Sequence, residues 1–334
     1  MITFESVLTI CFIILILFSL KRNVNEEFFS KKHTQYLRGI FAAFIMIFHI
    51  SKENDILFPF LEYLSIVVVG AFFFLSGYGL FKSYLGSNNF RETFIKRRIV
   101  KIVIPYIIAT LIYWLYHSLI GNHYTVLDII KSIISFGPIV MYSWFIVSLI
   151  VQYTMFYIII ALCKNTKRVL MVVVILMLVR IVLLMSGVSY VDVLNEMTCF
   201  GILFANYDVR IMRFVKNKRM LIFLLSLALT LLMSIDLLSF REVPVLFNVI
   251  EKVLFIFMII IFSTYYTFEN AFIGLLGKIS FELYMFSGLS KMIIRRFLDT
   301  SVFIQDFAIY ILAIVLSIVL HSFFNIISNQ LSRN

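Results

Sequence analysis

Long runs of apolar residues, separated by short polar segments, follow one another along almost the whole chain. Runs such as VLTICFIILILFSL (7–20) and LIFLLSLALTLLMSI (221–235) approach the roughly 20 apolar residues that a helix needs to cross a bilayer. The pattern predicts an all-α, polytopic membrane bundle of about eleven transmembrane helices. The predicted spans are 2–20, 36–52, 60–82, 101–120, 141–163, 168–187, 194–206, 219–238, 246–267, 271–290 and 302–324.

The polar segments between these runs are short, and no internal repeat or low-complexity stretch divides the sequence. We therefore expect a single integral-membrane domain over 1–334. The first apolar run lacks the basic region and the small-residue cleavage site of a signal peptide. We interpret it as a helix that the protein retains.

Composition supports contact with lipid rather than water. Of the 334 residues, 62% are hydrophobic and 14% are charged, whereas a soluble globular domain is roughly 45–50% apolar and about 25% charged. The three cysteines, Cys11, Cys163 and Cys199, show neither a disulfide framework nor a zinc pattern. His117 and His123 are six residues apart and do not fit a helical i, i+4 metal pair, so we expect no metal.

The net charge of +11 indicates orientation rather than nucleic-acid binding, because lysine and arginine gather in short loops between the spans. The basic segments are 21–38, 82–101, 163–168 and 206–219, while the loops around 52–62, 121–140, 187–196 and 236–251 are neutral or acidic. The positive-inside rule then predicts an N-terminus outside and a C-terminus in the cytoplasm. One loop disagrees, since 291–301 carries Lys291, Arg295 and Arg296 and yet should face outward.

Arg38 and His49 are unusual because lipid disfavours both residues, and both lie in the apolar run YLRGIFAAFIMIFHI (36–50). Eleven residues make about three helical turns, so both side chains face nearly the same way, roughly 16 Å apart along the axis. The topology places Arg38 at the cytoplasmic end and His49 deeper, toward the outer half. Anchoring of the helix end by Arg38 and a satisfied interhelical hydrogen bond at His49 are simpler alternatives. Histidine titrates near neutral pH, so His49 also suits proton transfer.

Arginine, ten residues and then histidine on the first core helix is a pattern that resembles the acyltransferase 3 family of bacterial membrane O-acyltransferases. Three further segments are similar to family motifs: GAFFFLSGYGL (70–80), FIKRRIVKIVIPYI (94–107) and GKISFELYMF (277–286). The resemblance covers about 36–324. The family core has ten helices with both ends cytoplasmic, so an extra N-terminal helix and linker, 1–35, would give eleven helices and an outside N-terminus.

The chain also departs from the family pattern. Lys101 stands where members often have arginine, which keeps the charge but loses the bidentate fork. Ser287 stands three residues after Tyr284, where many members have histidine, so a role tied to that histidine does not transfer. No SGNH-type hydrolase domain follows the last span, so the membrane part would act alone or with a separate partner.

The resemblance implies transfer of an acyl group, usually acetyl, from cytoplasmic acetyl-CoA or another acyl-CoA to a hydroxyl on the outer side of the bacterial cell membrane. The acceptor would be a glycan or lipid-linked saccharide. Arg38, Arg97, Arg98 and Lys101 would hold the CoA phosphates by charge-assisted hydrogen bonds. The alternative for these residues is ordinary positive-inside charge. His49 would act as general base, and direct transfer and an acyl-enzyme both remain open.

Four further residues are secondary candidates. Ser76 could be a nucleophile, but small residues in FLSGYG also allow close helix packing. Glu282 lies inside a predicted span and needs a partner, either a basic residue or a substrate. Tyr284 belongs to the Leu-Tyr motif. Trp144 near Tyr142 fits an aromatic belt, with stacking on an acceptor sugar as the alternative.

Two other functions compete with the acyltransferase. A polytopic transporter or flippase exporting a glycan or small molecule would also carry intramembrane charges, but it would more often show inverted repeats with broken helices. A family member that keeps the fold and serves in assembly or sensing is the third possibility. The sequence leaves the acceptor, the acyl group and the oligomeric state open.

Overall fold

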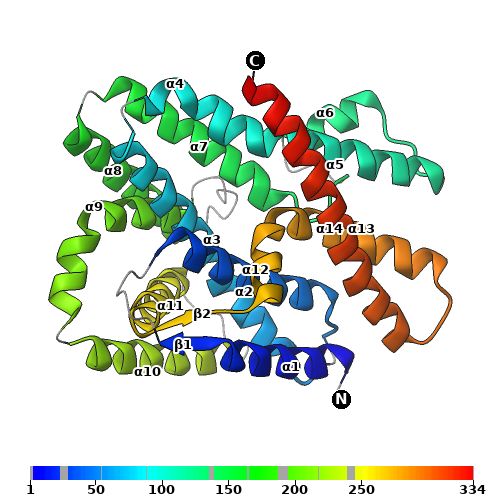
Figure 1. Cartoon of the computed structure of the whole chain (residues 1–334), viewed down its shortest axis with the longest axis horizontal. Coiled ribbons are helices and arrows are strands. Elements are labelled where there is room, and N and C mark those ends of the chain that lie inside the picture. The colour runs from blue at the N-terminus through cyan, green and yellow to red at the C-terminus, as the bar shows by residue number, and fades with distance from the viewer. Residues whose placement is uncertain are drawn as a thin grey trace. The chain divides into compact units, whose positions relative to one another are not determined.

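The computed structural model describes residues 3–22, 29–53, 55–87, 89–134, 139–163, 165–186, 195–216, 218–238 and 245–333, and nearly all of them are helical (Figure 1). The elements in chain order are α1 (Phe4–Phe18), β1 (Leu20–Arg22), α2 (Lys31–Ile50), α3 (Phe58–Leu85), α4 (Phe90–Phe94), η1 (Ile95–Ile99), α5 (Val100–Leu119), α6 (Val126–Ile134), α7 (Trp144–Leu162), α8 (Thr166–Met185), α9 (Glu196–Lys216), α10 (Arg219–Leu238), α11 (Val245–Tyr265), β2 (Tyr266–Phe268), α12 (Ala271–Lys278), α13 (Ser280–Phe297) and α14 (Val302–Arg333).

Five of the described helices are long and apolar enough to cross a membrane: α3, α5, α7, α11 and α14. The pair α12 and α13 becomes a sixth if it is counted as one span across the break at Ile279. Ten of the predicted spans overlap one described helix each and the span 271–290 overlaps two, so the all-α membrane architecture is confirmed. The number eleven stays a prediction, because only these helices of the described part of the chain meet the length and composition of a span.

Three boundaries differ from those expected. The predicted loop 206–219 is helical as far as Lys216, and the predicted loop 121–140 contains α6. Thr125 and Asp128 start α6 by reciprocal capping, since the Thr125 N–H and hydroxyl donate to Asp128 Oδ2 at 2.9 and 2.7 Å. The predicted span 271–290 is two helices, and glycine at 277, which weakens a helix, stands just before the break.

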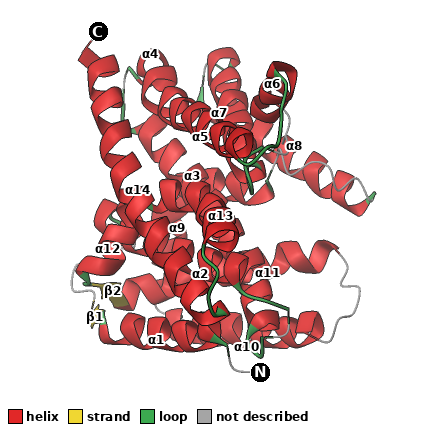
Figure 2. Cartoon of the chain, turned by 90° about the vertical axis from the view of Figure 1, so that its right-hand side faces the viewer, coloured by secondary structure: helices red, strands yellow, loops and turns green. Residues whose placement is uncertain are grey.

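The chain forms two compact units. Unit 1 comprises Met1–Asn88 and Asn165–Lys278, and unit 2 comprises Asn89–Lys164 and Ile279–Asn334. Unit 1 includes a two-stranded antiparallel ribbon of β1 and β2, in which Lys21 pairs with Thr267 (Figure 2). The strands are only three residues long, so helix packing accounts for most of the core.

Close helix contacts in unit 1 depend on glycine. A Cβ added at Gly77 on α3 would lie 2.1 Å from the Thr198 carbonyl oxygen on α9, and one at Gly201 on α9 would lie 2.2 Å from the Phe74 oxygen. In the same way, a Cβ at Gly39 on α2 would lie 2.3 Å from the Ile273 oxygen on α12. Small residues let helix backbones approach closely, as is typical of membrane bundles.

Asp55, in the connection between α2 and α3, anchors the start of the chain. The hydroxyls of Thr3 and Ser6 donate to its two carboxylate oxygens, and the Leu57 N–H donates to Oδ1 at 2.8 Å. Burial alone would raise the pKa of Asp55, but these hydrogen bonds outweigh it and lower the pKa below 3.8. The carboxylate therefore stabilises the contact of α1 with this connection in its ionised form.

Candidate functional site

Arg38 and His49 lie on one unbroken helix, α2, which begins after Ser30, whose side chain accepts from the His33 N–H at 3.1 Å. Arg38 is exposed, and its Nε donates to the Thr34 carbonyl at 3.4 Å. His49 is half-buried in the last turn. Because no break separates them, the axial distance of roughly 16 Å between their backbones holds. The roles assigned to them stay predictions.

The basic segment after α4 belongs to unit 2. Arg97 and Arg98 lie in η1, a π-helical turn that joins α4 to α5, and Lys101 lies in the first turn of α5. Arg98 is half-buried and Lys101 is exposed, while the side chain of Arg97 lies outside what the structure describes. π-Helical turns are uncommon and often occur at functional sites. Arg38 and His49 belong to unit 1 instead.

The FLSGYG segment of α3 serves helix packing at Gly77, as its contact with Thr198 confirms. Ser76 beside it is half-buried, and a nucleophilic role stays a prediction. Near the end of α3, Lys82 forms an ion pair with Asp208 of α9 at 2.5 Å, and the Tyr78 hydroxyl donates to the same carboxylate at 3.0 Å. This partnership ties α9 to α3 within the predicted loop 206–219.

Glu282 has a partner in unit 2. The ring Nδ1 of His321 on α14 lies 3.0 Å from Glu282 Oε1 on α13. Glu282 is buried, and Glu282 Oε2 has no hydrogen-bond partner among the described residues. The expectation that Glu282 requires a partner is thus met by His321, a residue near the end of the last apolar run.

Tyr284, Tyr142 and Trp144 gather where α13 meets the start of α7. The Tyr284 hydroxyl donates to the Tyr142 carbonyl at 2.6 Å, and Tyr142 has a φ of 65°, a left-handed conformation that is rare for a bulky residue. Trp144 is half-buried and its ring lies 6.2 Å from Phe145, which in turn lies 5.3 Å from Tyr284. Strained backbone of this kind often occurs at functional sites, so this cluster stays a candidate for acceptor contact.

At the other end of α13, Arg295 pairs with Asp306 and Gln305 near the start of α14. Asp306 is buried. The loop 291–301 that opposed the positive-inside rule is helical as far as Phe297, and the ion pair neutralises one of its three charges.

A chain of charges around the buried Glu196 in unit 1 was not singled out by sequence reasoning. Lys252 Nζ on α11 lies 3.0 Å from Glu196 Oε1 on α9, and Arg180 Nε on α8 lies 3.6 Å from Glu196 Oε2. The stem of Lys252 passes Gly70 of α3, where an added Cβ would lie 3.0 Å from it. The sequence feature that could have revealed these residues is their position inside apolar runs, where a charged residue indicates a buried pairing or a functional path.

Glu251, next to Lys252, is completely buried, and neither of its carboxylate oxygens has a hydrogen-bond partner in the described part of the chain. An ionised carboxylate in such a position is strongly disfavoured.

A second buried polar group in unit 1 surrounds His33 of α2. Its Nε2 lies 2.8 Å from Ser263 Oγ on α11, and its Nδ1 lies 3.1 Å from Thr267 Oγ1 on β2. The ring also stacks on Phe268 with the centroids 5.7 Å apart. Both ring nitrogens therefore have hydroxyl partners, which satisfies a histidine that is only 2% exposed.

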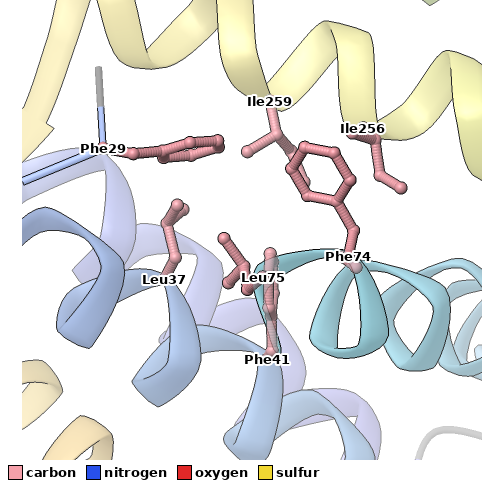
Figure 3. Close-up of a pocket in the computed structure, with 8 residues that line it drawn as sticks. Phe29, Leu37, Phe41, Phe74, Leu75, Ile256 and Ile259 are labelled. Atoms are coloured by element: carbon pink, nitrogen blue, oxygen red, sulfur yellow. The ribbon is translucent and has the colours of Figure 1, made fainter. Parts of the chain in front are cut away.

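A small apolar pocket lies between α2, α3 and α11, with Phe29, Leu37, Phe41 and Phe74 among the residues that line it (Figure 3). Its empty volume is about 190 Å³, below the roughly 300–1,000 Å³ of ligand pockets. The pocket is far too small for a CoA nucleotide in this conformation.

The span-length apolar helices and the charged side chains buried between helices define a multi-pass membrane protein. A sequence profile of the acyltransferase 3 family, described as an acyltransferase domain, matches residues 34–322. The chain therefore belongs to this family and is a membrane acyltransferase, which confirms the resemblance. Neither a curated protein nor a solved structure matched the chain.

Proposed function

We propose that the protein transfers an acyl group, most simply acetyl, from cytoplasmic acyl-CoA to a hydroxyl of a glycan or lipid-linked saccharide on the outer side of a bacterial cell membrane. The observation that carries the proposal is the family match over 34–322, which contains both Arg38 and His49 on one unbroken helix. The alternation of basic and neutral loops supports an outside N-terminus and a cytoplasmic C-terminus.

The residues divide into a donor set and a base. Arg38, Arg98 and Lys101 are cations that suit the CoA phosphates, and Arg97 is proposed with them from sequence alone. His49 takes the proton of the acceptor hydroxyl while the hydroxyl oxygen attacks the acyl carbonyl. The carbon–sulfur bond then breaks, and its electron pair leaves with the thiolate of CoA.

Four secondary residues complete the proposal. Tyr284 and Trp144 offer aromatic surface to an acceptor sugar, and Glu282 acts through its histidine partner. Ser76 would serve only if the reaction passes through an acyl-enzyme.

The test follows labelled acetyl-CoA into alkali-labile label on extracted glycans and lipids, in membranes carrying wild type, His49→Ala or Arg38→Ala. We expect His49→Ala to lower the rate about 10²–10⁴-fold, the usual contribution of a general base. Arg38→Ala should chiefly raise the KM for acetyl-CoA, because it removes a charge-assisted contact.

Two exposed residues serve as matched controls, His123 in the loop after α5 and Arg213 on α9, and alanine at either should leave the rate unchanged. His49→Ala that is present at the wild-type level and transfers label at the wild-type rate would refute the catalytic role. If wild type consumes no acetyl-CoA while the glycan still reaches the outer surface in a manner that depends on the protein, the transporter alternative is favoured.

A further inference from the structure

Glu282 and His321 form a carboxylate–imidazole pair between α13 and α14. Glu282 Oε1 lies 3.0 Å from His321 Nδ1, and Glu282 is 6% exposed. The His321 side chain is 31% exposed, and its Nε2 makes no hydrogen bond within the described residues. One ring nitrogen is therefore held from inside the protein while the other is presented outward.

This arrangement is the one that proton-transfer histidines commonly have. A carboxylate against one ring nitrogen fixes the tautomer and ring orientation, and it stabilises the imidazolium when the other nitrogen gains a proton. The remaining oxygen, Glu282 Oε2, has no hydrogen-bond partner among the described residues, so the carboxylate is not consumed by other contacts. A contact that only joined α13 to α14 would require neither an exposed His321 ring nor an unpartnered Glu282 Oε2.

Contacts within unit 2 place the pair on the side of the basic segment. The Tyr113 hydroxyl of α5 donates to the Met285 carbonyl at 2.9 Å, and the Tyr116 hydroxyl donates to the Met292 carbonyl at 3.0 Å. Since both contacts advance together along the two helices, α5 and α13 run in the same sense. The start of α5, which carries Lys101, and the start of α13 therefore lie toward the same end of unit 2.

The depth that separates Lys101 from the Glu282–His321 pair is suited to an acyl-CoA donor. Lys101 lies twelve residues before Tyr113, or about 18 Å along α5, and Glu282 lies three residues before Met285, or about 4.5 Å along α13. The second contact, Tyr116 with Met292, gives about 22 Å along α5 and about 15 Å along α13. Phosphates held near Lys101 and a thioester near His321 would thus be separated by roughly 8–14 Å in depth. An extended pantetheine arm bridges a gap of this order.

We propose that His321, oriented by Glu282, donates a proton to the departing sulfur of the acyl donor. The inference rests on the proposed function. As the acceptor oxygen bonds to the acyl carbon, the carbon–sulfur bond breaks, its electron pair moves to sulfur, and the proton on His321 Nε2 follows. A thiol such as that of cysteine has a pKa of about 8.5, so the departing sulfur is more stable protonated near neutral pH. Protonation also removes a thiolate that could attack the product ester. The acceptor's proton goes to the general base of the proposed reaction, and His321 regains a proton from solvent before the next cycle.

The test uses purified full-length protein in lipid vesicles with labelled acetyl-CoA and His321→Asn as the main variant. The asparagine amide N–H can replace Nδ1–H as a donor to Glu282, so the link between α13 and α14 is kept while the proton carrier is lost. We expect kcat to fall about 10²–10⁴-fold with the KM for acetyl-CoA and the thermal unfolding midpoint unchanged. Added imidazole should restore part of the rate to His321→Ala. Ser322→Ala, an exposed neighbour on α14, is the control.

His321→Asn that turns over within twofold of wild type would overturn the inference and leave the proposed function intact. A lowered kcat that comes with a lowered unfolding midpoint in both variants, and that imidazole does not rescue, would also overturn it, because the pair would then be a staple. If wild type transfers no label from acetyl-CoA, the proposed function fails and the inference fails with it.

Discussion

Replacing Gly39 by alanine should weaken unit 1 by separating α2 from α12. The added Cβ would lie 2.3 Å from the Ile273 carbonyl oxygen and 2.8 Å from the Gly277 nitrogen, whereas ordinary contact begins at 3.4 Å. All of these obstacles are backbone atoms, so no side chain can rotate away and the helices must move apart by about 1 Å. Gaps of this size forfeit a quarter to a half of the contact energy of the atoms involved.

The matched control is Gly79→Ala, in the interior of α3, where an added Cβ meets nothing within 4 Å. Both substitutions gain the helix propensity of alanine, up to about 1 kcal/mol. The difference between the two variants therefore isolates the steric contact, and overpacking of this kind typically costs about 1–3 kcal/mol. Gly39→Ala should be the less stable of the two by that amount.

Unfolding in mild detergent can be followed through Cys199, which is buried on α9 within unit 1. With Cys11 and Cys163 replaced by serine, a thiol-reactive fluorophore reports the opening of that unit alone. If Gly39→Ala and Gly79→Ala unfold at the same denaturant concentration, the close approach of α2 and α12 does not explain glycine at this position.

Two further predictions concern charge. Lys252→Met should destabilise the protein by about 3–5 kcal/mol because it leaves Glu196 buried without its nearest cation. Glu251→Gln, at the neighbouring residue, should be neutral or stabilising. Denaturant unfolding of both variants tests this, and an equal loss of unfolding free energy in the two would contradict it. The pKa of Asp55 is lowered below 3.8 despite burial, so its stabilisation is present above that pH and lost as the pH falls through the folded-state value. The stability difference between wild type and Asp55→Asn should thus be constant from about pH 5 to 8 and shrink below about pH 4; a difference that is independent of pH down to about pH 2 would show that the carboxylate charge does not matter.

The helices could be predicted because a membrane helix appears in the sequence as a long apolar run. The positions where the helices end could not be predicted. An apolar run marks only the part of a helix that lies in lipid, and the helix can extend beyond it. For this reason the sequence did not show that α9 and α13 continue to Lys216 and Phe297. The amphipathic α6 has too few residues to be recognised as a span. The sequence feature that indicates its start is the Thr125–Asp128 capping pair.

Within the candidate sites, only residues on one helix could be related from sequence. Arg38 and His49 share α2, so helical periodicity alone gave their spacing. Glu282 and His321 are on different helices, as are Arg180 and Glu196, and a single sequence contains no information on which helices pack together. An ionisable residue inside an apolar run indicates that a partner is needed, without saying which residue it is.

The order in which the chain visits its two units has a consequence for synthesis. Unit 1 is interrupted after residue 88 and is complete only at residue 278, while unit 2 is complete only with α14. About 250 residues are synthesised between strand β1 and its partner β2. At roughly 5–20 residues per second, this takes on the order of 10–50 s on the ribosome. During that time the face of α2 that carries Gly39 has no α12 to cover it. A nascent chain that stalls before residue 271 therefore leaves this helix open in the membrane to non-native helix partners and to proteases.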